Sequence, residues 1–271
     1  ADVTVMGATV GPVRGSLVPG PGGQEYTFVK TAGLLPPDTY TVTLRSASDG
    51  WKDVNGQPLD GNGNETPGDN YVTSFLVPPP AAGAIVVSLP NVTRGRGQPV
   101  NIPADNLAAG LPLTISNGLG VSRVDLHLHY DPALLTISGF TLDGAVVNRG
   151  GAASLSFPSL GIAALSITVS NGFAAAAGPL TVGSFTARVP DNAPYRGKHI
   201  LDIEELHIYD TKTPPLELPS IDDDALHVAA FLGDTSGDGT YNSPDATLVR
   251  RIIGQVSTGF LASQMVDPVL I

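Results

Sequence analysis

Oxygen-bearing side chains recur at a fixed spacing in residues 234–245 of the sequence. They occupy positions 1, 3, 5, 9 and 12 of this stretch, and Gly239 stands at position 6. Hard oxygen donors at this spacing can surround one Ca²⁺ ion, with a backbone carbonyl added at position 7, and the glycine permits the sharp turn between them. The stretch therefore predicts a calcium-binding loop, and the alternative is an Asp/Gly-rich surface turn that binds nothing. The candidate ligands are Asp234, Ser236, Asp238, Thr240, Asn242 and Asp245.

A short helix is expected immediately after this loop, over residues 243–253. Ser243 suits the N-cap and Pro244 the first helical position. The usual EF-hand loop ends in Glu, whereas this one ends in Asp. With the pair Arg250–Arg251 in the helix, residues 231–271 resemble a type I dockerin repeat, which normally carries two such loops, so we expect its first half here. The resemblance implies a surface for a protein partner, formed by Ser243, Leu248, Arg250, Arg251 and Ile252.

A second candidate calcium loop lies in residues 60–69, where oxygen donors alternate along the chain. Alternating donors can wrap a hard cation. Because Asx–Gly pairs are also common in plain turns, a turn without metal is an equal alternative. The candidate ligands are Asp60, Asn62, Asn64 and Asp69.

Three further polar residues, Asp125, His127 and His129, alternate along one predicted strand. Two histidines two residues apart on a strand can share a transition metal. We interpret them instead as the solvated face of a half-buried strand, because no further ligand can be identified from the sequence.

Composition limits the class of protein. The 271 residues allow roughly two or three small domains, and there is no cysteine for disulfides or thiolate metal sites. The net charge of −11 argues against nucleic acid and anionic membranes as partners. The same acidic balance suits a secreted or cell-surface protein in calcium-containing surroundings, and no apolar run has the length of a membrane-spanning helix. We expect no enzyme, because neither a nucleophile elbow, a phosphate loop nor a His–Ser–Asp frame is recognisable.

Period-two alternation and frequent Gly and Pro predict an all-β chain of tandem sandwiches, followed by the loop and helix. In residues 1–77, Tyr40, Val42 and Leu44 share one face of a strand. The segment Pro37–Leu44 and the following Asp49–Gly56 resemble bacterial Ig-like domains of surface proteins. About five strands are recognisable where an Ig-like sandwich has about seven, so we expect this domain to be incomplete at its N-terminus. The proline-rich residues 78–83 predict a linker.

Residues 84–230 predict a second, antiparallel sandwich. Its clearest strand is 121–130, and the apolar phase slips at Glu204–Glu205, which predicts a β-bulge. The run Val124–Leu135, an alternating strand that ends in Tyr-Asp-Pro and two leucines, resembles the signature of cohesin modules. That resemblance implies a jelly-roll sandwich that binds dockerins and has no catalytic centre.

These features together predict a non-catalytic extracellular protein that mediates calcium-dependent protein–protein assembly. One hypothesis is a filament, in which the apolar segment Val266–Ile271 or a neighbouring segment of the next subunit completes the incomplete sandwich. Simple truncation of a longer polypeptide would explain the missing strands equally well. A rival is the accessory scaffolding region of a secreted carbohydrate-active enzyme. A carbohydrate-binding module ranks last, because Trp51 is the single tryptophan and aromatics are sparse.

Overall fold

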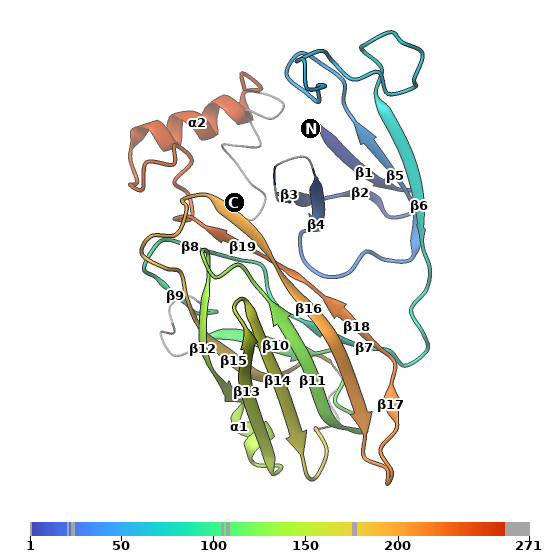
Figure 1. Cartoon of the computed structure of the whole chain (residues 1–271), viewed down its shortest axis with the longest axis vertical. Helices are drawn as coiled ribbons and strands as arrows, with labels where there is room; N and C mark the ends of the chain where they lie inside the picture. The colour runs from blue at the N-terminus through green and yellow to red at the C-terminus, as the bar shows by residue number, and fades with distance from the viewer. Residues whose placement is uncertain are drawn as a thin grey trace. The chain divides into compact units, whose positions relative to one another are not determined.

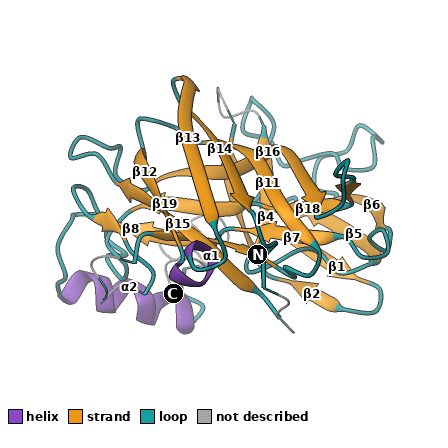
Figure 2. Ribbon diagram, turned by 90° about the horizontal axis from the view of Figure 1, so that it is seen from below, coloured by secondary structure: helices purple, strands orange, loops and turns teal. Residues whose placement is uncertain are grey.

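The computed structural model describes residues 2–20, 22, 25–103, 106, 109–174 and 178–257. The chain divides into two compact units, one of Ala1–Ser16, Leu34–Pro80 and Leu232–Ile271, the other of Leu17–Gly33 and Ala81–Phe231. Residues 17–33 thus group with the second unit, whereas the sequence analysis placed them in the first domain. The described residues are mostly strand, drawn orange in Figure 2, which confirms the all-β class.

The first unit is built on one antiparallel sheet of four strands in the order β2-β1-β5-β6. Tyr40 and Val42 lie on the same face, as their spacing predicts, and Val42 pairs with Val5 while Tyr40 pairs with Phe75. Tyr40 and Val5 are buried, so this face carries the apolar contacts of the sheet. The assignment of the unit to an Ig-like sandwich stays a prediction. The strands are β1 (Val3–Gly7), β2 (Gly11–Val13), β5 (Asp38–Leu44) and β6 (Tyr71–Val77).

The second unit holds two large sheets, shown in Figure 1. The first sheet has the order β12-β15-β10-β7-β18, with β9 beside β15. Its strands are β7 (Ile85–Ser88), β9 (Pro99–Val100), β10 (Leu111–Ile115), β12 (Thr136–Leu142), β15 (Leu180–Arg188) and β18 (Ser220–Asp223). The second sheet has the order β13-β14-β11-β16-β19-β8, with β17 beside β16. Its strands are β8 (Val92–Arg94), β11 (Val121–His129), β13 (Gly151–Ser159), β14 (Ile162–Val169), β16 (Gly197–Asp210), β17 (Glu217–Leu218) and β19 (Ala225–Ala229).

One hydrophobic core joins these two sheets into a sandwich. Leu113 on β10 and Phe185 on β15 belong to one sheet, Leu126 on β11 and Ile167 on β14 to the other, and all are buried in the same cluster. The strands β10, β11 and β14 alternate buried and outward-facing residues, because successive side chains point to opposite faces of a sheet. Inward Leu126 and outward His127 on β11 therefore agree with the predicted alternation.

Three features of the second unit refine the predictions. The bulge is confirmed, since β16 offers Glu205 and Leu206 opposite the single residue Leu126, and Glu205 has a left-handed φ of 48°. The sandwich is not purely antiparallel, because β18 runs parallel to β7 and β19 parallel to β8. A short helix, α1 (Gly144–Val147), was not predicted, and Asp143 caps it by accepting a hydrogen bond from the amide of Ala145.

A two-stranded sheet of β3 (Gly15–Pro19) and β4 (Tyr26–Lys30) completes the strands.

Candidate functional site

The loop at residues 234–239 folds around the carboxylate of Asp234. This residue is buried, with an exposed fraction of 2%. Its Oδ1 accepts a hydrogen bond from the amide of Gly237 at 2.8 Å, and its Oδ2 accepts one from Gly239 at 2.7 Å. Gly237 and Gly239 have left-handed φ values of 76° and 83°, a conformation that glycine adopts without steric cost. The two glycines therefore allow the backbone to turn its N–H groups toward one carboxylate.

Asp245 ties this loop to the helix α2 (Ser243–Ile253). Its Oδ1 accepts from the amide of Ser236 at 2.8 Å, and its Oδ2 accepts from the amide of Asn242 at 2.8 Å. These N–H groups lower the pKa of Asp245, because they stabilise its charged form. Asn242, with extended backbone, is the N-cap, so the prediction of Ser243 was wrong by one residue. The reason is that Asp245 at the third helical position bonds back to the Asn242 amide, as in a capping box.

The remaining predicted ligands meet on the exposed side of the loop. Asp238 accepts hydrogen bonds from the amide of Thr240 at 2.8 Å and from its hydroxyl at 2.7 Å. Its other oxygen accepts from the side-chain amide of Asn242 at 2.7 Å. The Thr240 hydroxyl and the Asn242 amide lower the pKa of Asp238, and the charge of Asp245 opposes them. The charge of Asp245 thus reaches Asp238, so the two carboxylates lie within electrostatic range of each other.

The donor chemistry of this loop suits a hard cation. Asp234 and Asp245 both accept hydrogen bonds from Ser236, from its hydroxyl and its backbone amide respectively, so the two carboxylates lie on the same part of the loop. Within the described ranges, no three His, Asp or Glu side chains are arranged so that they could hold a metal ion. Calcium sites, however, also use hydroxyl, amide and carbonyl oxygens, which Ser236, Asn242 and Thr240 offer. The residues present fit calcium better than a transition metal, which prefers nitrogen or sulfur ligands.

The loop at residues 60–69 repeats this backbone pattern. Oδ1 of Asp60 accepts from the amides of Gly63 at 2.9 Å and Asn64 at 3.1 Å, and Oδ2 accepts from Glu65 at 2.7 Å. Gly63 and Glu65 have left-handed φ values of 72° and 67°. The first carboxylate thus receives the amides of the fourth and sixth loop positions, as Asp234 does in the other loop.

The far end of this loop closes on its beginning. The side-chain amide of Asn62 donates to Asp69 at 2.9 Å, and the backbone amide of Gly61 donates to the Asp69 carbonyl at 3.0 Å. Two predicted ligands, Asn62 and Asp69, are therefore in direct contact, while Asn64 uses its side-chain oxygen to accept from the Thr66 amide. The likeness to residues 234–239 was not predicted, because Glu65 stands where a glycine is expected. The spacing of Asp60, Asn62 and Asn64 at positions 1, 3 and 5 could have shown it.

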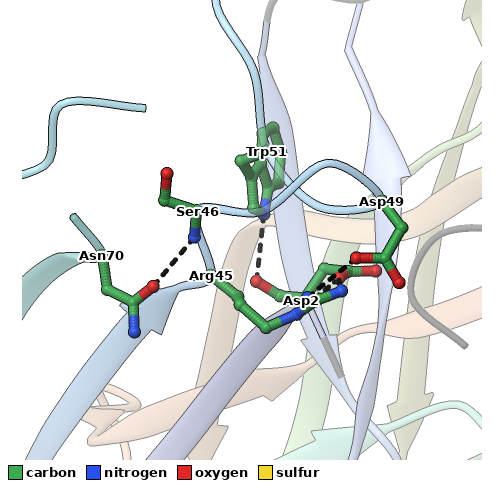
Figure 3. A network of polar contacts seen from close by, with 6 residues as sticks. All are labelled: Asp2, Arg45, Ser46, Asp49, Trp51 and Asn70. Atoms are coloured by element: carbon green, nitrogen blue, oxygen red, sulfur yellow. Dashed lines mark hydrogen bonds and ion pairs between the residues drawn. The ribbon is translucent and has the colours of Figure 1, made fainter. Parts of the chain in front are cut away.

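A polar network holds the base of this loop in the first unit (Figure 3). The Arg45 guanidinium contacts the carboxylate of Asp2 at 2.6 Å, and the Trp51 indole N–H donates to the Asp2 carbonyl at 3.1 Å. The amide of Ser46 donates to the side chain of Asn70, the residue next to the loop, at 2.9 Å. The loop is therefore anchored to the sheet through the residues that follow β5 and precede β6.

The predicted partner surface on α2 divides into exposed and half-buried residues. Ser243, Arg250 and Arg251 are exposed, whereas Leu248 and Ile252 are half-buried. Leu248 and Ile252 are four residues apart and so share one helix face. The two arginines lie in the last turn, where positive charge also interacts favourably with the helix dipole.

The outward-facing side chains of β11 contact polar residues of the neighbouring strands, which the sequence did not predict. Nδ1 of His127 lies 3.1 Å from Glu205, and Nε2 of His129 lies 3.3 Å from Glu204. Asp125 accepts a hydrogen bond from the hydroxyl of Ser166 at 2.6 Å. Each of the three residues thus contacts a polar neighbour on an adjacent strand, which agrees with a solvated polar face.

No protein-family model and no curated protein matches the chain. No helix among the described residues is long and apolar enough to cross a membrane.

Several solved cohesin structures are similar in fold. A non-cellulosomal cohesin from Archaeoglobus fulgidus is 14% identical, with a TM-score of 0.44, over 59% of this chain and 100% of that one. The sixth cohesin of Acetivibrio cellulolyticus scaffoldin B, solved with a Cel5 dockerin, is 15% identical, with a TM-score of 0.44, over 54% and 99%. A Clostridium thermocellum cohesin, solved in a type I cohesin–dockerin complex, is 11% identical, with a TM-score of 0.43, over 55% and 95%.

Proposed function

We propose that this chain is a non-catalytic, secreted or cell-surface protein in which calcium orders a segment for protein–protein assembly. The observation that carries the proposal is the double role of Asp245. Its carboxylate bonds to Ser236 inside the loop and to Asn242 at the start of α2. A cation held between Asp245 and Asp234 would therefore fix the helix to the loop.

Calcium would act here by charge neutralisation. Three carboxylates, those of Asp234, Asp238 and Asp245, share a loop of twelve residues, and two of them are buried. Like charges at this density repel one another, and the repulsion is stronger where the surroundings exclude water. Binding of a divalent cation removes this repulsion and so stabilises the loop and the helix together.

The partner we propose is a protein of the cohesin or dockerin type, or a second copy of this chain. On α2, Arg250 and Arg251 are exposed and Leu248 and Ile252 are half-buried, which is a mixture of charged and apolar groups suited to a protein surface. The overall charge of −11 makes this positive pair a distinct feature of the molecule. It would favour an acidic surface on the partner.

We propose the 60–69 loop as a second calcium site, because it shares its hydrogen-bond pattern with residues 234–239. In both loops the first carboxylate accepts hydrogen bonds from the amides of positions 4 and 6, so the chain turns in the same way around it. Asp69, held against Asn62, would supply the distal carboxylate. Extracellular calcium modules bind with dissociation constants of about 10⁻⁴–10⁻³ M, and we expect both loops in this range.

Assembly into a filament by strand donation is the finer part of the proposal. The strand β6 ends its sheet, and six of its seven residues are exposed. It contains no charge and no proline, two features that natural proteins use to block pairing at a sheet edge. The proposed donor, Val266–Ile271, lies outside the described residues. Deleting these six residues should abolish polymerisation if they donate the strand, and undiminished polymerisation would exclude them as donors.

Calcium titration calorimetry on the full chain tests the central claim. We expect Asp238→Asn to weaken binding at the 234–245 loop at least tenfold and Asp60→Asn to remove the second binding event. Asp191→Asn, which changes an exposed carboxylate in the second unit, serves as the matched control and should change neither event. Absence of heat and of any spectral change at millimolar calcium would refute the proposal.

Light scattering with and without chelator tests the assembly. We expect the apparent mass to fall when calcium is removed and to recover when it is restored. A monomer whose mass is indifferent to chelator would contradict assembly while leaving calcium binding intact.

A further inference from the structure

Two buried histidines lie side by side at one end of the second unit, outside every site described so far. His199 on β16 and His227 on β19 are direct partners in the antiparallel pairing of these strands. Their rings meet edge to face, with centroids 5.0 Å apart at an angle of 83°. The exposed fraction is 8% for His199 and 0% for His227. Such burial disfavours a positive charge on either ring.

The hydrogen bonds around this pair define where each ring carries its proton. The backbone amide of Asp131 donates to Nδ1 of His199 at 2.8 Å, so His199 carries its proton on Nε2. Nε2 of His199 lies 2.8 Å from Nδ1 of His227 and must donate to it. His227 therefore carries its own proton on Nε2, which is buried and has no partner among the described residues. The network thus assigns one tautomer to each ring.

An additional proton on either ring would break one of these hydrogen bonds, because both Nδ1 atoms already act as acceptors. A proton on Nδ1 of His199 would point at the Asp131 amide hydrogen, and one on Nδ1 of His227 would point at the His199 N–H. Either event replaces a hydrogen bond by a contact between two donors. It also places a positive charge on a buried ring, where an unpaired charge is strongly unfavourable.

Charged groups on two further elements act on the rings, and neither removes this conflict. The carboxylate of Asp131 favours a charge on His199, whereas Arg94, at the end of β8, disfavours one on His227. Arg94 is itself engaged with the backbone carbonyls of Thr93 and Asn101. Lys198 also lies nearby, and its ammonium group lies 3.5 Å from the Leu17 carbonyl. Burial dominates, and it lowers the pKa of His199 to about 4 and that of His227 to about 3.

The bond from Asp131 to His199 secures a turn that packs on the end of the sandwich. The amides of Leu134 and Leu135 both donate to the Asp131 carbonyl, at 3.0 and 2.9 Å, which closes the turn. Leu134 is buried in a small cluster with Val189, Ala193 and Ala229. Gly197 lies so close to Leu134 that an added Cβ would overlap the leucine side chain. The turn is thus held to the start of β16 by one hydrogen bond and by apolar packing.

We propose that His199 and His227 form an acid-sensitive latch, in which protonation of the pair releases the Asp131–Leu135 turn and loosens this end of the sandwich. The direction of the pH dependence follows from the linkage between proton binding and the stability of the closed form. Exposed histidines take up protons at a pH near 6.5, well above the pKa of either ring in the closed form. The closed form is therefore fully stable above pH 6.5, and it loses stability as the pH falls toward about 4. The equilibrium constant for opening should rise about tenfold per pH unit for each proton taken up.

Hydrogen exchange of the full chain between pH 7 and pH 4.5 tests the latch. After correction for the intrinsic exchange rate, we expect the amides of Leu134 and Leu135 to lose protection at least tenfold per pH unit below about pH 6. Amides of β14 serve as the internal reference and should keep their protection. Equal loss of protection in both segments would indicate global acid unfolding and overturn the proposal.

The variant His199→Asn separates titration from packing. Its side-chain oxygen can accept from the Asp131 amide at the place of Nδ1, but it cannot take up a proton. We expect the loss of protection in this variant to be about tenfold smaller per pH unit, because one of the two protons is no longer taken up. The matched control His129→Asn, which changes a partly exposed ring on the outer face, should behave as the unmodified protein does.

Nuclear magnetic resonance of the two rings gives a measurement that requires no variant. We expect both histidines to stay neutral, with the proton on Nε2, down to about pH 5. Titration of His199 near pH 6.5 in the folded chain would show that burial does not hold it neutral and would overturn the latch. The same result would leave the proposed calcium sites untouched.

Discussion

Substitution of Gly61 by alanine is a strict test of how the 60–69 loop is closed. Gly61 lies at the neck of the loop, where its amide donates to the Asp69 carbonyl at 3.0 Å. A Cβ added to Gly61 would overlap the carbonyl group of Asn70 and the amide nitrogen of Tyr71. All the overlapped atoms belong to the backbone, so no side-chain rotation can relieve the contact.

The size of the effect follows from this geometry. Non-bonded carbon atoms normally approach to about 3.5–4 Å, so one strand of the neck must move by more than about 1 Å to admit the methyl group. Overpacking of this kind costs about 1–3 kcal/mol, and the neck hydrogen bond from Gly61 adds about 1 kcal/mol if it breaks. We therefore expect Gly61→Ala to lower the free energy of unfolding of the first unit by about 2–4 kcal/mol.

Gly63→Ala, in the same loop, is the matched control. Gly63 has a left-handed φ of 72°, but an added Cβ meets no atom within 4 Å. Its cost is therefore the conformational one alone, about 1–2 kcal/mol. The difference between the two variants isolates the steric closure of the neck.

Fluorescence of Trp51 provides the assay. Trp51 is the single tryptophan of the chain and belongs to the same unit as the loop, so its emission during urea unfolding reports on this unit and not on the second. We expect the midpoint of Gly61→Ala to fall below that of Gly63→Ala. Equal midpoints, or a lower midpoint for Gly63→Ala, would refute the close packing at Gly61. Calcium affinity measured on the same samples would show whether this packing is needed for binding.

Three further substitutions test other parts of the structure. Arg45→Met should destabilise the first unit by about 2 kcal/mol, measured by Trp51 fluorescence, because it leaves the buried Asp2 carboxylate without its cation. Phe185→Ala should cost the second unit about 3–5 kcal/mol in calorimetric unfolding, because it opens a cavity in the core beside an edge-to-face ring. Asp224→Asn should stabilise the second unit increasingly as the pH rises from about 4 to about 7 and no further above, because burial raises the pKa of Asp224 to about 7 and only the unfolded chain ionises in that range.

One exposed ion pair supplies two of the controls. Arg188 and Asp191 lie 2.8 Å apart, and their side chains are 51% and 78% exposed. Arg188→Met should change stability by less than about 1 kcal/mol, since exposed pairs contribute little. Asp191→Asn serves as the control over the same range of about pH 4 to 7, and an equal rise in the stability of this variant would contradict the reasoning for Asp224.

Local sequence predicted those features that depend on near neighbours. The spacing of Asp234, Asp238 and Asp245, the helix that follows, and the alternation of β11 all arise from contacts within a few residues. For the same reason the bulge at Glu205 was visible as a slip in the apolar phase. The N-cap was wrong by one residue because the choice between Asn242 and Ser243 depends on which amide the Asp245 side chain reaches.

Tertiary structure decided whatever depends on residues that are distant in the sequence. The parallel pairs β18–β7 and β19–β8 join segments more than 130 residues apart, and no local pattern encodes such pairing. In the sequence His199 and His227 are two unrelated polar residues. The register of β16 and β19 places their rings side by side, and the Asp131 amide reaches His199 from a third element. Alternation fixes which face a side chain occupies, whereas only the packed sheets determine the neighbour that it meets there, because register is chosen by the burial of the whole core.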